Sequence, residues 1–409
     1  MSVGNRVRVR VSGRRLRGYV TATFDADPGR KLLPIDGLSG QIPSFDASSL
    51  ESLRWAATHY VTPLSVILKR SVPPNVPQPT ASWTGVARDS RRGSVQEHLP
   101  VFRVGATPFG PDVASSIKAA ADDRRSVVVI APSVREVTDM AAHLADLHGD
   151  RVVTATSSMS ARSVTRSWVA IATREGTILV GTREVALWPF GDVDIVVVVE
   201  DGRRVMRSPS TPTLGVREVI LHRSRVEPFR VVFHGPVPTL ETLAALSTVE
   251  EPPGRQWPMI EVVDRGEDPP GTGMLAERTK AAIRSVASEG APVFVLVGSR
   301  GYAPAFRCVS CGDVQRCSKC GSAASRGSAC RRCGERLTPC KSCGGTRLYP
   351  LGAGIGSIVD DIGRFVDSVG RQGDKKLVTV GSERDLIDIT KVALSVAVDV
   401  DGLAMAPHY

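Results

Sequence analysis

Residues 126–156 read SVVVIAPSVREVTDMAAHLADLHGDRVVTAT, and this stretch decides the fold. The apolar run at 126–131 predicts a buried strand, and residues 134–148 predict an amphipathic helix. A second, short strand is expected at 152–156. Strands made of largely continuous β-branched residues and separated by helices indicate a parallel, doubly wound sheet.

The same alternation continues on both sides of this stretch. Further helices are expected at residues 117–121, 161–173, 274–288 and 358–369. Further strands are expected at residues 177–180, 194–199, 229–233, 293–297, 377–380 and 392–398. Breaks rich in proline and glycine separate two such regions, at 250–254 and 268–273. The fold class is therefore multi-domain α/β.

A different pattern occupies the N-terminus, where residues 6–11 read RVRVRV. This period of two predicts a strand with its valines on one face and its arginines on the other. A turn at 12–13 and a returning strand at 15–23 complete a β-hairpin, and a helix is expected at 50–60.

Arginine is frequent in this hairpin, because the first twenty residues contain six arginines and no acidic residue. Contact with nucleic-acid phosphates is one interpretation, and a solvated strand face or loop is the other. The candidates for DNA contact are Arg14, Arg15 and Arg17.

Composition limits the classes of protein that fit. The chain has 409 residues, 42% of them hydrophobic and 23% charged, which excludes a wholly disordered protein. Proline, serine and charged residues without periodicity mark a linker at 72–98. No apolar run approaches the ~20 residues that a bilayer requires, so no membrane partner is expected. The first twenty residues lack the apolar segment of a secretory signal, and the expected location is the cytoplasm.

All eight cysteines lie between residues 308 and 343, as four Cys-x2-Cys pairs. Each pair can present two thiolates to one ion, and zinc takes four such ligands in a tetrahedron. The pairs therefore predict two closed, structural zinc sites. Their ligands would be Cys308 with Cys311, Cys317 with Cys320, Cys330 with Cys333, and Cys340 with Cys343.

Alternatives exist for this segment. A disulfide framework is typical of small secreted domains, and an iron–sulfur cluster fits evenly repeated pairs less well than zinc does. The zinc sites could form from consecutive pairs or from nested pairs. Nine residues between Cys320 and Cys330 suit a hairpin that closes an inner site, but spacing does not decide between the two arrangements.

Positive charge is concentrated around the cysteines. Residues 300–347 contain ten basic and two acidic side chains, a formal charge of +8. Two zinc centres, each with four thiolates and a net charge of −2, would leave about +4. Nucleic acid is the expected partner of this surface, and an acidic protein surface is the alternative.

A co-linear series of motifs resembles the PriA family of bacterial replication-restart proteins, which is a helicase-type family. The motifs are the SRGYAP lead-in at 299–304, the four cysteine pairs, PLGAG at 350–354, GTRE at 181–184, PF at 189–190, HGPVPTLE at 234–241 and DVDG at 399–402. The resemblance covers nearly the whole chain. It implies nested pairing, in which Cys308, Cys311, Cys340 and Cys343 hold one ion and Cys317, Cys320, Cys330 and Cys333 hold the other.

The resemblance also implies a β-rich N-terminal domain and two RecA-like helicase lobes, with the zinc module inserted in the second. The implied parts are a DNA-binding β domain at 1–71, the linker at 72–98, a degenerate first lobe at 99–250, the start of the second lobe at 256–300, the zinc module at 301–349 and a truncated continuation of the second lobe at 350–409. A winged-helix insert of the family has no room here. Both ends also look short relative to the family.

The phosphate loop of the family, G-x-T-G-S-G-K-T, has decayed at residues 105–112, which read GATPFGPD. In the family the loop amides hold the phosphates, the lysine meets their charge and the final hydroxyl holds Mg²⁺. Two prolines in the loop each remove an N–H donor. The residues of this degenerate site are Gly105, Thr107, Gly110, Pro111 (at the lysine position) and Asp112 (at the hydroxyl position).

The second nucleotide motif, DEEH in the family, aligns with residues 199–202. The aspartate that organises Mg²⁺ has become Val199. Glu200 and Asp201 remain as acids, and we favour a solvated strand end over a surviving acid pair. ATP and Mg²⁺ are therefore not expected as cofactors, and we nominate no catalytic residue.

The resemblance implies a replication restart factor that binds stalled or abandoned forks and promotes primosome assembly and replicative helicase loading, without helicase activity. Its expected partners are forked DNA and the helicase-loading proteins. One alternative is an active ATP-dependent 3'–5' DNA helicase of the same family. Another is a zinc-ribbon interaction protein of the transcription or translation machinery.

Overall fold

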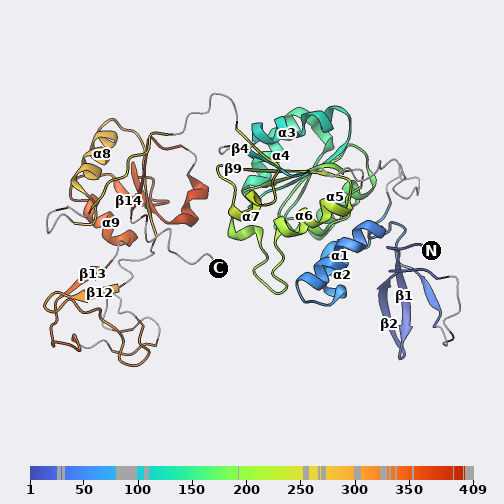
Figure 1. Cartoon of the computed structure of the whole chain (residues 1–409), viewed down its shortest axis with the longest axis horizontal. Helices are drawn as coiled ribbons and strands as arrows, with labels where there is room; N and C mark the ends of the chain where they lie inside the picture. The colour runs from blue at the N-terminus through green and yellow to red at the C-terminus, as the bar shows by residue number, and fades with distance from the viewer. Residues whose placement is uncertain are drawn as a thin grey trace. The chain divides into compact units, whose positions relative to one another are not determined.

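The computed structural model divides the chain into two compact units, Met1–Gln256 and Trp257–Tyr409. Each unit is described by itself (Figure 1). The structure describes residues 1–24, 29, 33–79, 99–105, 110–191, 193–251, 258–265, 268, 273–298, 305–322, 329–330, 333–336, 339–351, 354–389, 391–398 and 400.

The first unit begins with a three-stranded antiparallel sheet in the order β2-β1-β3. Its strands are β1 (Arg6–Val11), β2 (Arg14–Tyr19) and β3 (Ile35–Leu38). Ser12 and Gly13 join β1 to β2 and both have positive φ angles, of 47° and 77°. Such a two-residue turn matches the right-handed twist of a hairpin, which confirms the expected β-hairpin.

The alternation expected for β1 holds in the middle of the strand, over residues 7–10, and fails at both ends. Val7 is buried, but Val11 is 42% exposed. Arg6 is buried although it lies on the arginine face. The base is covered on both sides and the tip on neither, so burial follows position along the strand as well as the face.

Two helices follow the sheet, α1 (Ala47–His59) and α2 (Leu64–Ser71). Asp46 caps α1 by accepting a hydrogen bond from the backbone N–H of Ser49, so the helix starts three residues before the expected Leu50. The sequence analysis missed α2. Both helices contribute to the same hydrophobic core as the large sheet that follows.

That large sheet has seven parallel strands in the order β10-β4-β9-β8-β5-β7-β6. This confirms the parallel α/β fold class. The strands are β4 (Val101–Val104), β5 (Ser126–Ile130), β6 (Val152–Ala155), β7 (Ile178–Gly181), β8 (Val193–Val199), β9 (Arg230–Gly235) and β10 (Thr248–Glu250).

Helices cover both faces of this sheet (Figure 1). They are α3 (Gly110–Asp122), α4 (Val134–His148), α5 (Ala161–Thr173), α6 (Val216–Val226) and α7 (Leu240–Leu243), with short 3₁₀ turns η1 (Gly149–Arg151), η2 (Arg183–Leu187) and η3 (Arg204–Met206). Val127 and Val129 of β5 pack with α3 and α4. Val128 and Ile130 pack with α5 and α6. Two covered faces explain why the central strands read as continuous apolar runs.

Most elements of this unit match the expected ranges. Helices α4 and α5 have the bounds that the sequence predicts. Helix α3 starts at Gly110, seven residues before the expected start. Two elements were not expected from the sequence. Strand β4 is four residues long and follows Pro100, and helix α6 contains many charged residues.

The second unit contains a four-stranded parallel sheet in the order β14-β15-β11-β16. Its strands are β11 (Val293–Val297), β14 (Val369–Arg371), β15 (Val378–Gly381) and β16 (Leu394–Val398). Its helices are α8 (Glu277–Ser288) and α9 (Ile355–Ile362), with the 3₁₀ turn η4 (Glu383–Asp388).

The helix expected at 358–369 is wrong at its C-terminus. Helix α9 ends at Ile362, and Val369 already begins β14. The N–H groups of Phe365 and Val366 both bond back to the carbonyl of Ile362, which turns the chain into the next strand.

The cysteine segment follows β11 in the chain and precedes α9. Strands β12 (Ala305–Cys308) and β13 (Leu348–Leu351) pair antiparallel and bring its two ends together. Over the described ranges, no helix is long and apolar enough to cross a membrane.

Candidate metal centres and nucleic-acid surface

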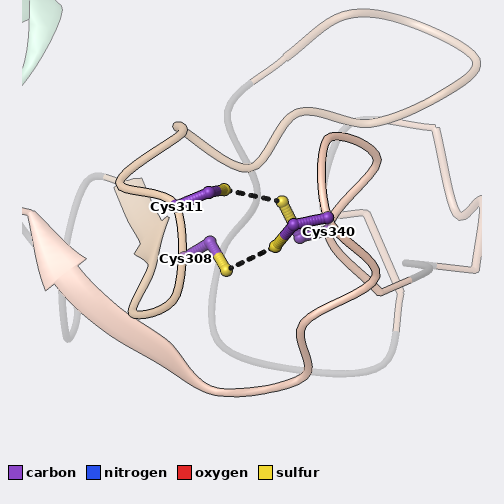
Figure 2. Close-up of side chains that lie close together, drawn as sticks. Cys308, Cys311 and Cys340 are labelled. Carbon is purple, nitrogen blue, oxygen red and sulfur yellow. Dashed lines mark hydrogen bonds between the residues drawn. The ribbon is translucent and has the colours of Figure 1, made fainter.

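The structure gathers the eight cysteines into two groups of four. In the first group, Cys308 Sγ lies 3.5 Å from Cys343 Sγ, and Cys311 Sγ lies 3.5 Å from Cys340 Sγ. Figure 2 shows Cys308 and Cys311 facing Cys340 across the centre of this group. All four sulfur atoms lie within 4.8 Å of one another.

The second group has the same geometry. Cys317 Sγ lies 3.6 Å from Cys333 Sγ, and Cys320 Sγ lies 3.7 Å from Cys330 Sγ. Four sulfurs at ~2.3 Å from one tetrahedral ion would be separated by about 3.8 Å. A disulfide requires about 2.05 Å, so none of these contacts is a covalent bridge. Both groups have the donor type and the spacing of a closed site for a single ion.

One backbone turn is repeated at all four Cys-x2-Cys pairs. In each, the glycine after the second cysteine donates its N–H to the carbonyl of the first cysteine, at 2.7–3.1 Å. Each of these glycines has a φ between 70° and 75°, where other residues are strained. The four glycines are Gly312, Gly321, Gly334 and Gly344. The motif is therefore Cys-x2-Cys-Gly at all four pairs.

The first cysteine of each pair is buried, and the second is exposed or half-buried. Backbone N–H groups of Cys311 and Ser310 lower the pKa of the Cys308 thiol to about 6. A side chain at Gly345 would approach Cys308 Sγ to 2.9 Å, so glycine is needed there for the chain to pass the first group. Backbone hydrogen bonds within the Cys-x2-Cys-Gly turns thus help to position the cysteine sulfurs.

Exposed basic side chains surround these two groups. Among the described residues they are Arg307, Arg316, Lys319, Arg336, Lys341 and Arg347. The other four basic residues of the segment, Arg300, Arg326, Arg331 and Arg332, lie outside the described residues. The described part of the module alone therefore presents several cations to solvent.

The degenerate phosphate loop is described only at its two ends, because Thr107 and its neighbours at 106–109 lie outside the described residues. Gly105 follows β4, whereas Gly110, Pro111 and Asp112 open α3. The carboxylate of Asp112 folds back over Gly105, into space that a side chain on Gly105 would need. An acid therefore lies beside the N-terminus of the helix that holds phosphate in phosphate-loop proteins.

His234, at the end of β9, also lies next to the position that a side chain on Gly105 would take, and it is 1% exposed. Its Nε2 lies 2.6 Å from Ser116 Oγ, to which Arg103 also donates at 2.8 Å. Burial, and secondarily the charge of Arg103, lower the pKa of His234 to about 4. The imidazole is therefore neutral at physiological pH.

The interpretation of residues 199–202 as a solvated strand end is wrong. Val199 is fully buried, and Glu200 pairs with Arg203 at 2.7 Å. Asp201 is also buried and accepts hydrogen bonds from Arg217, at 3.1 Å, and from Thr242. The two acids thus act in separate structural pairs, which sequence alone could not show because both bases lie outside the motif.

The three arginine candidates of the hairpin do not share one face. Arg15 lies opposite Arg10, and Arg17 lies opposite Arg8. Arg14 lies opposite Val11, on the other face of the sheet. All three candidates are exposed.

The helices beside the hairpin are attached to the large sheet domain through specific contacts. The Trp55 ring of α1 stacks on His222 of α6 at 4.1 Å. Ser52 Oγ donates to Glu227 Oε1 at 3.0 Å, and Trp168 Nε1 donates to the carbonyl of Ser71 at 3.0 Å. The hairpin domain and the sheet domain therefore share an interface as well as a core.

Comparison with known proteins gives two results. Residues 1–73 match the profile of a family described as "3'DNA-binding domain (3'BD)". The chain is 26% identical over 415 residues to the "Probable replication restart protein PriA" of Mycobacterium tuberculosis (strain ATCC 25618 / H37Rv), covering 88% of this chain and 62% of that protein.

Other known proteins are similar to the chain at lower sequence identity. The corresponding protein of Mycobacterium leprae (strain TN) is 24% identical, covering 95% of this chain and 67% of that protein. The "Replication restart protein PriA" of Bacillus subtilis (strain 168) is 21% identical, covering 66% of this chain and 36% of that protein. The helicase domain of Hef from Pyrococcus furiosus aligns with a TM-score of 0.29 and 16% identity, over 38% of this chain and 35% of that chain. The chain spans about six tenths of the length of the M. tuberculosis relative.

Proposed function

Because the chain is similar to PriA replication restart proteins over most of its length, we propose that it belongs to this family and binds DNA at stalled or abandoned replication forks. There it promotes assembly of the primosome and loading of the replicative helicase. The observation that carries this proposal is the N-terminal domain, which matches a 3'DNA-binding family over residues 1–73. Its arginine-rich hairpin supports the same function, because DNA affinity depends largely on neutralised phosphates.

The protein performs this role without a helicase motor. Pro108 and Pro111 remove amide donors that a phosphate loop requires. The carboxylate of Asp112 lies beside the α3 N-terminus, where it would repel a nucleotide phosphate. Val199 cannot organise Mg²⁺, and Asp201 is already held by Arg217 and Thr242.

Two structural zinc ions complete the cysteine module. The eight thiolates fit them in number, chemistry and spacing, with Cys308, Cys311, Cys340 and Cys343 around one ion and Cys317, Cys320, Cys330 and Cys333 around the other. Within the described part of the module, the regular strand pairing is the short β12–β13 ladder, so the ions would supply much of its folding energy. Its exposed cations would add contacts to DNA or to an acidic surface of a helicase-loading partner.

Fork binding is tested by fluorescence anisotropy with zinc-loaded full-length chain. A labelled fork and a linear duplex of the same length are titrated at two salt concentrations, and ATP turnover is measured in the same samples. We expect tighter binding to the fork at both salt concentrations, with ATP turnover at background.

Each alternative gives a different result. ATP hydrolysis stimulated by the fork would replace our proposal with an active 3'–5' helicase. Equal affinity for fork and linear duplex would contradict fork recognition and favour an interaction protein of the zinc-ribbon type.

A further inference from the structure

Four arginines share one face of the β1–β2 hairpin. The register pairs Arg8 with Arg17 and Arg10 with Arg15. Directly opposed residues of an antiparallel pair project to the same side, about 5 Å apart, and residues two apart on a strand are about 6.7 Å apart. The four side chains therefore start from the corners of a small grid. We call this set, Arg8, Arg10, Arg15 and Arg17, the arginine tetrad.

The tetrad is electrostatically unfavourable for the hairpin by itself. Like charges directly opposed across two strands destabilise the pairing. Among the described residues, a single carboxylate offsets them, because Arg10 Nε lies 3.1 Å from Asp36 Oδ2. Arg8 donates to the carbonyl of Leu38 at 3.0 Å, which orients the side chain without neutralising it. The grid thus keeps a net positive charge.

Arg6 shows what a structural arginine looks like on the same face. It is buried, and its guanidinium lies 5.6 Å from the centroid of the Tyr19 ring. The tetrad lies farther out on the hairpin, where its members are exposed to solvent. The hairpin itself extends away from α1 and α2 (Figure 1). Packing therefore accounts for Arg6 but not for the tetrad.

The opposite face of the same hairpin tip has a different chemistry. Val11 and Leu16 lie there, 42% and 48% exposed, together with Arg14. Arg14 is a single cation among aliphatic side chains. It has the same charge and a similar exposure as the tetrad arginines, but it points to the other side of the sheet.

We propose that the arginine tetrad binds the phosphate backbone of DNA and that Arg14 does not contribute to this contact. Guanidinium groups bind phosphate oxygens in a fork geometry, and a rigid grid of four can meet successive phosphates of one backbone. This inference rests on the proposed function only in taking DNA as the ligand. It goes further by assigning the face and the residues that make the contact.

The test measures how DNA affinity depends on salt. Each phosphate contact contributes about −0.9 to the slope of log K against log salt for duplex DNA. The double variant Arg15→Ala/Arg17→Ala should therefore make the slope of the full chain on linear duplex less steep by about 1.8. Arg14→Ala, the matched control, should leave the slope unchanged. Arg15→Lys/Arg17→Lys keeps the charge and should retain most of the slope.

Thermal unfolding of each variant accompanies the titrations. Removal of opposed like charges should leave the hairpin at least as stable, so a loss of slope with an unchanged melting temperature reports DNA contact. If Arg14→Ala changes the slope as much as the double variant does, the inference is wrong, because net charge alone then matters. An unchanged slope in the double variant also overturns the inference. The same holds if the double variant loses binding to an acidic protein but keeps its DNA binding.

The outcomes separate this inference from the proposed function. A wild-type chain without fork preference, whose duplex binding still depends on the tetrad, would refute fork recognition and support the tetrad. A chain that prefers forks but keeps its salt slope in the double variant would support fork recognition and refute the tetrad.

Discussion

At the scale of single residues, Asp112 and His234 show how the space around Gly105 is filled. The carboxylate of Asp112 and the buried, neutral imidazole of His234 both lie next to the position that a side chain on Gly105 would take. Ser116 and Arg103 continue this network to Glu250, at 2.6 Å from Arg103. These hydrogen bonds therefore link β9, α3, β4 and β10 near one edge of the sheet.

His234 makes the stability of the first unit depend on pH. Its pKa in the folded chain, about 4, lies below the ordinary value of 6.5 because the ring is buried. Above pH 6.5 the ring is neutral in both states. Below that pH the unfolded chain takes up a proton that the folded chain refuses, so the free energy of unfolding falls until about pH 4. The loss between pH 7 and pH 5 is about 2 kcal/mol.

This dependence is checked with His234→Gln, which cannot titrate. Denaturant unfolding is followed by the fluorescence of Trp168 and Trp188, which are buried in the first unit. Between pH 7 and pH 5 the wild type should lose about 2 kcal/mol more than the variant. Equal losses in the two proteins would show that His234 does not titrate in this range.

At the scale of elements, helices α1 and α6 form the joint between the hairpin domain and the seven-stranded sheet. Arg223 of α6 forms two hydrogen bonds to Glu227, both at 2.7 Å, and Ser52 of α1 bonds the same carboxylate. The guanidinium of Arg223 also lies 3.7 Å from the centroid of the Phe190 ring. The buried charges of Arg223 and Glu227 are thus paired with each other.

Removal of Glu227 should weaken this joint strongly. Glu227 and Arg223 have exposed side-chain fractions of 0% and 3%, so Glu227→Gln leaves a buried guanidinium without its counter-charge. The free energy of unfolding of the first unit should fall by about 3–5 kcal/mol. The matched control is Asp122→Asn, which breaks the exposed Lys118–Asp122 pair and should cost less than about 1 kcal/mol. Equal effects of the two variants would contradict the role of burial.

At the scale of the whole molecule, the chain contains three structural parts in two compact units: the hairpin, the seven-stranded sheet and the cysteine module. The first unit contains the hairpin and the seven-stranded sheet, and the second contains the cysteine module on its own four-stranded sheet. In the proposed function the hairpin contacts DNA, the sheet domain supports it, and the zinc module adds further contacts.

The grouping of the cysteines gives a test of this division. Cys317→Ser should reduce bound zinc from two ions to one and weaken fork binding, because a site with three ligands no longer closes. The double variant Cys317→Ser/Cys330→Ser should also keep one ion, since both residues lie in the same group. Consecutive pairing would instead place them in different sites and leave none. Elemental analysis measures the ions, and Ser318→Ala in the same turn serves as the control.

The sequence by itself determined the fold class, the central strands and the helices α4 and α5 of the large sheet domain, and the four thiolate pairs of the cysteine segment. These features are local in physical origin. Continuous β-branched runs, the 3.6-residue period of α4 and α5, and a two-thiolate turn each depend on residues close together in the chain. The departure of residues 105–112 from a phosphate-loop sequence was equally visible, because a missing lysine and two prolines act through local chemistry.

Only the tertiary structure decided which distant groups meet. It shows the nested sulfur groups in space, pairs Asp201 with Arg217, and joins Ser52 to Glu227 across 175 residues. It also separates Arg14 from Arg15 and Arg17, because strand register determines the face of each side chain and a shift of one residue reverses it. Pairing, burial and face are properties of packed elements, and no local pattern specifies them.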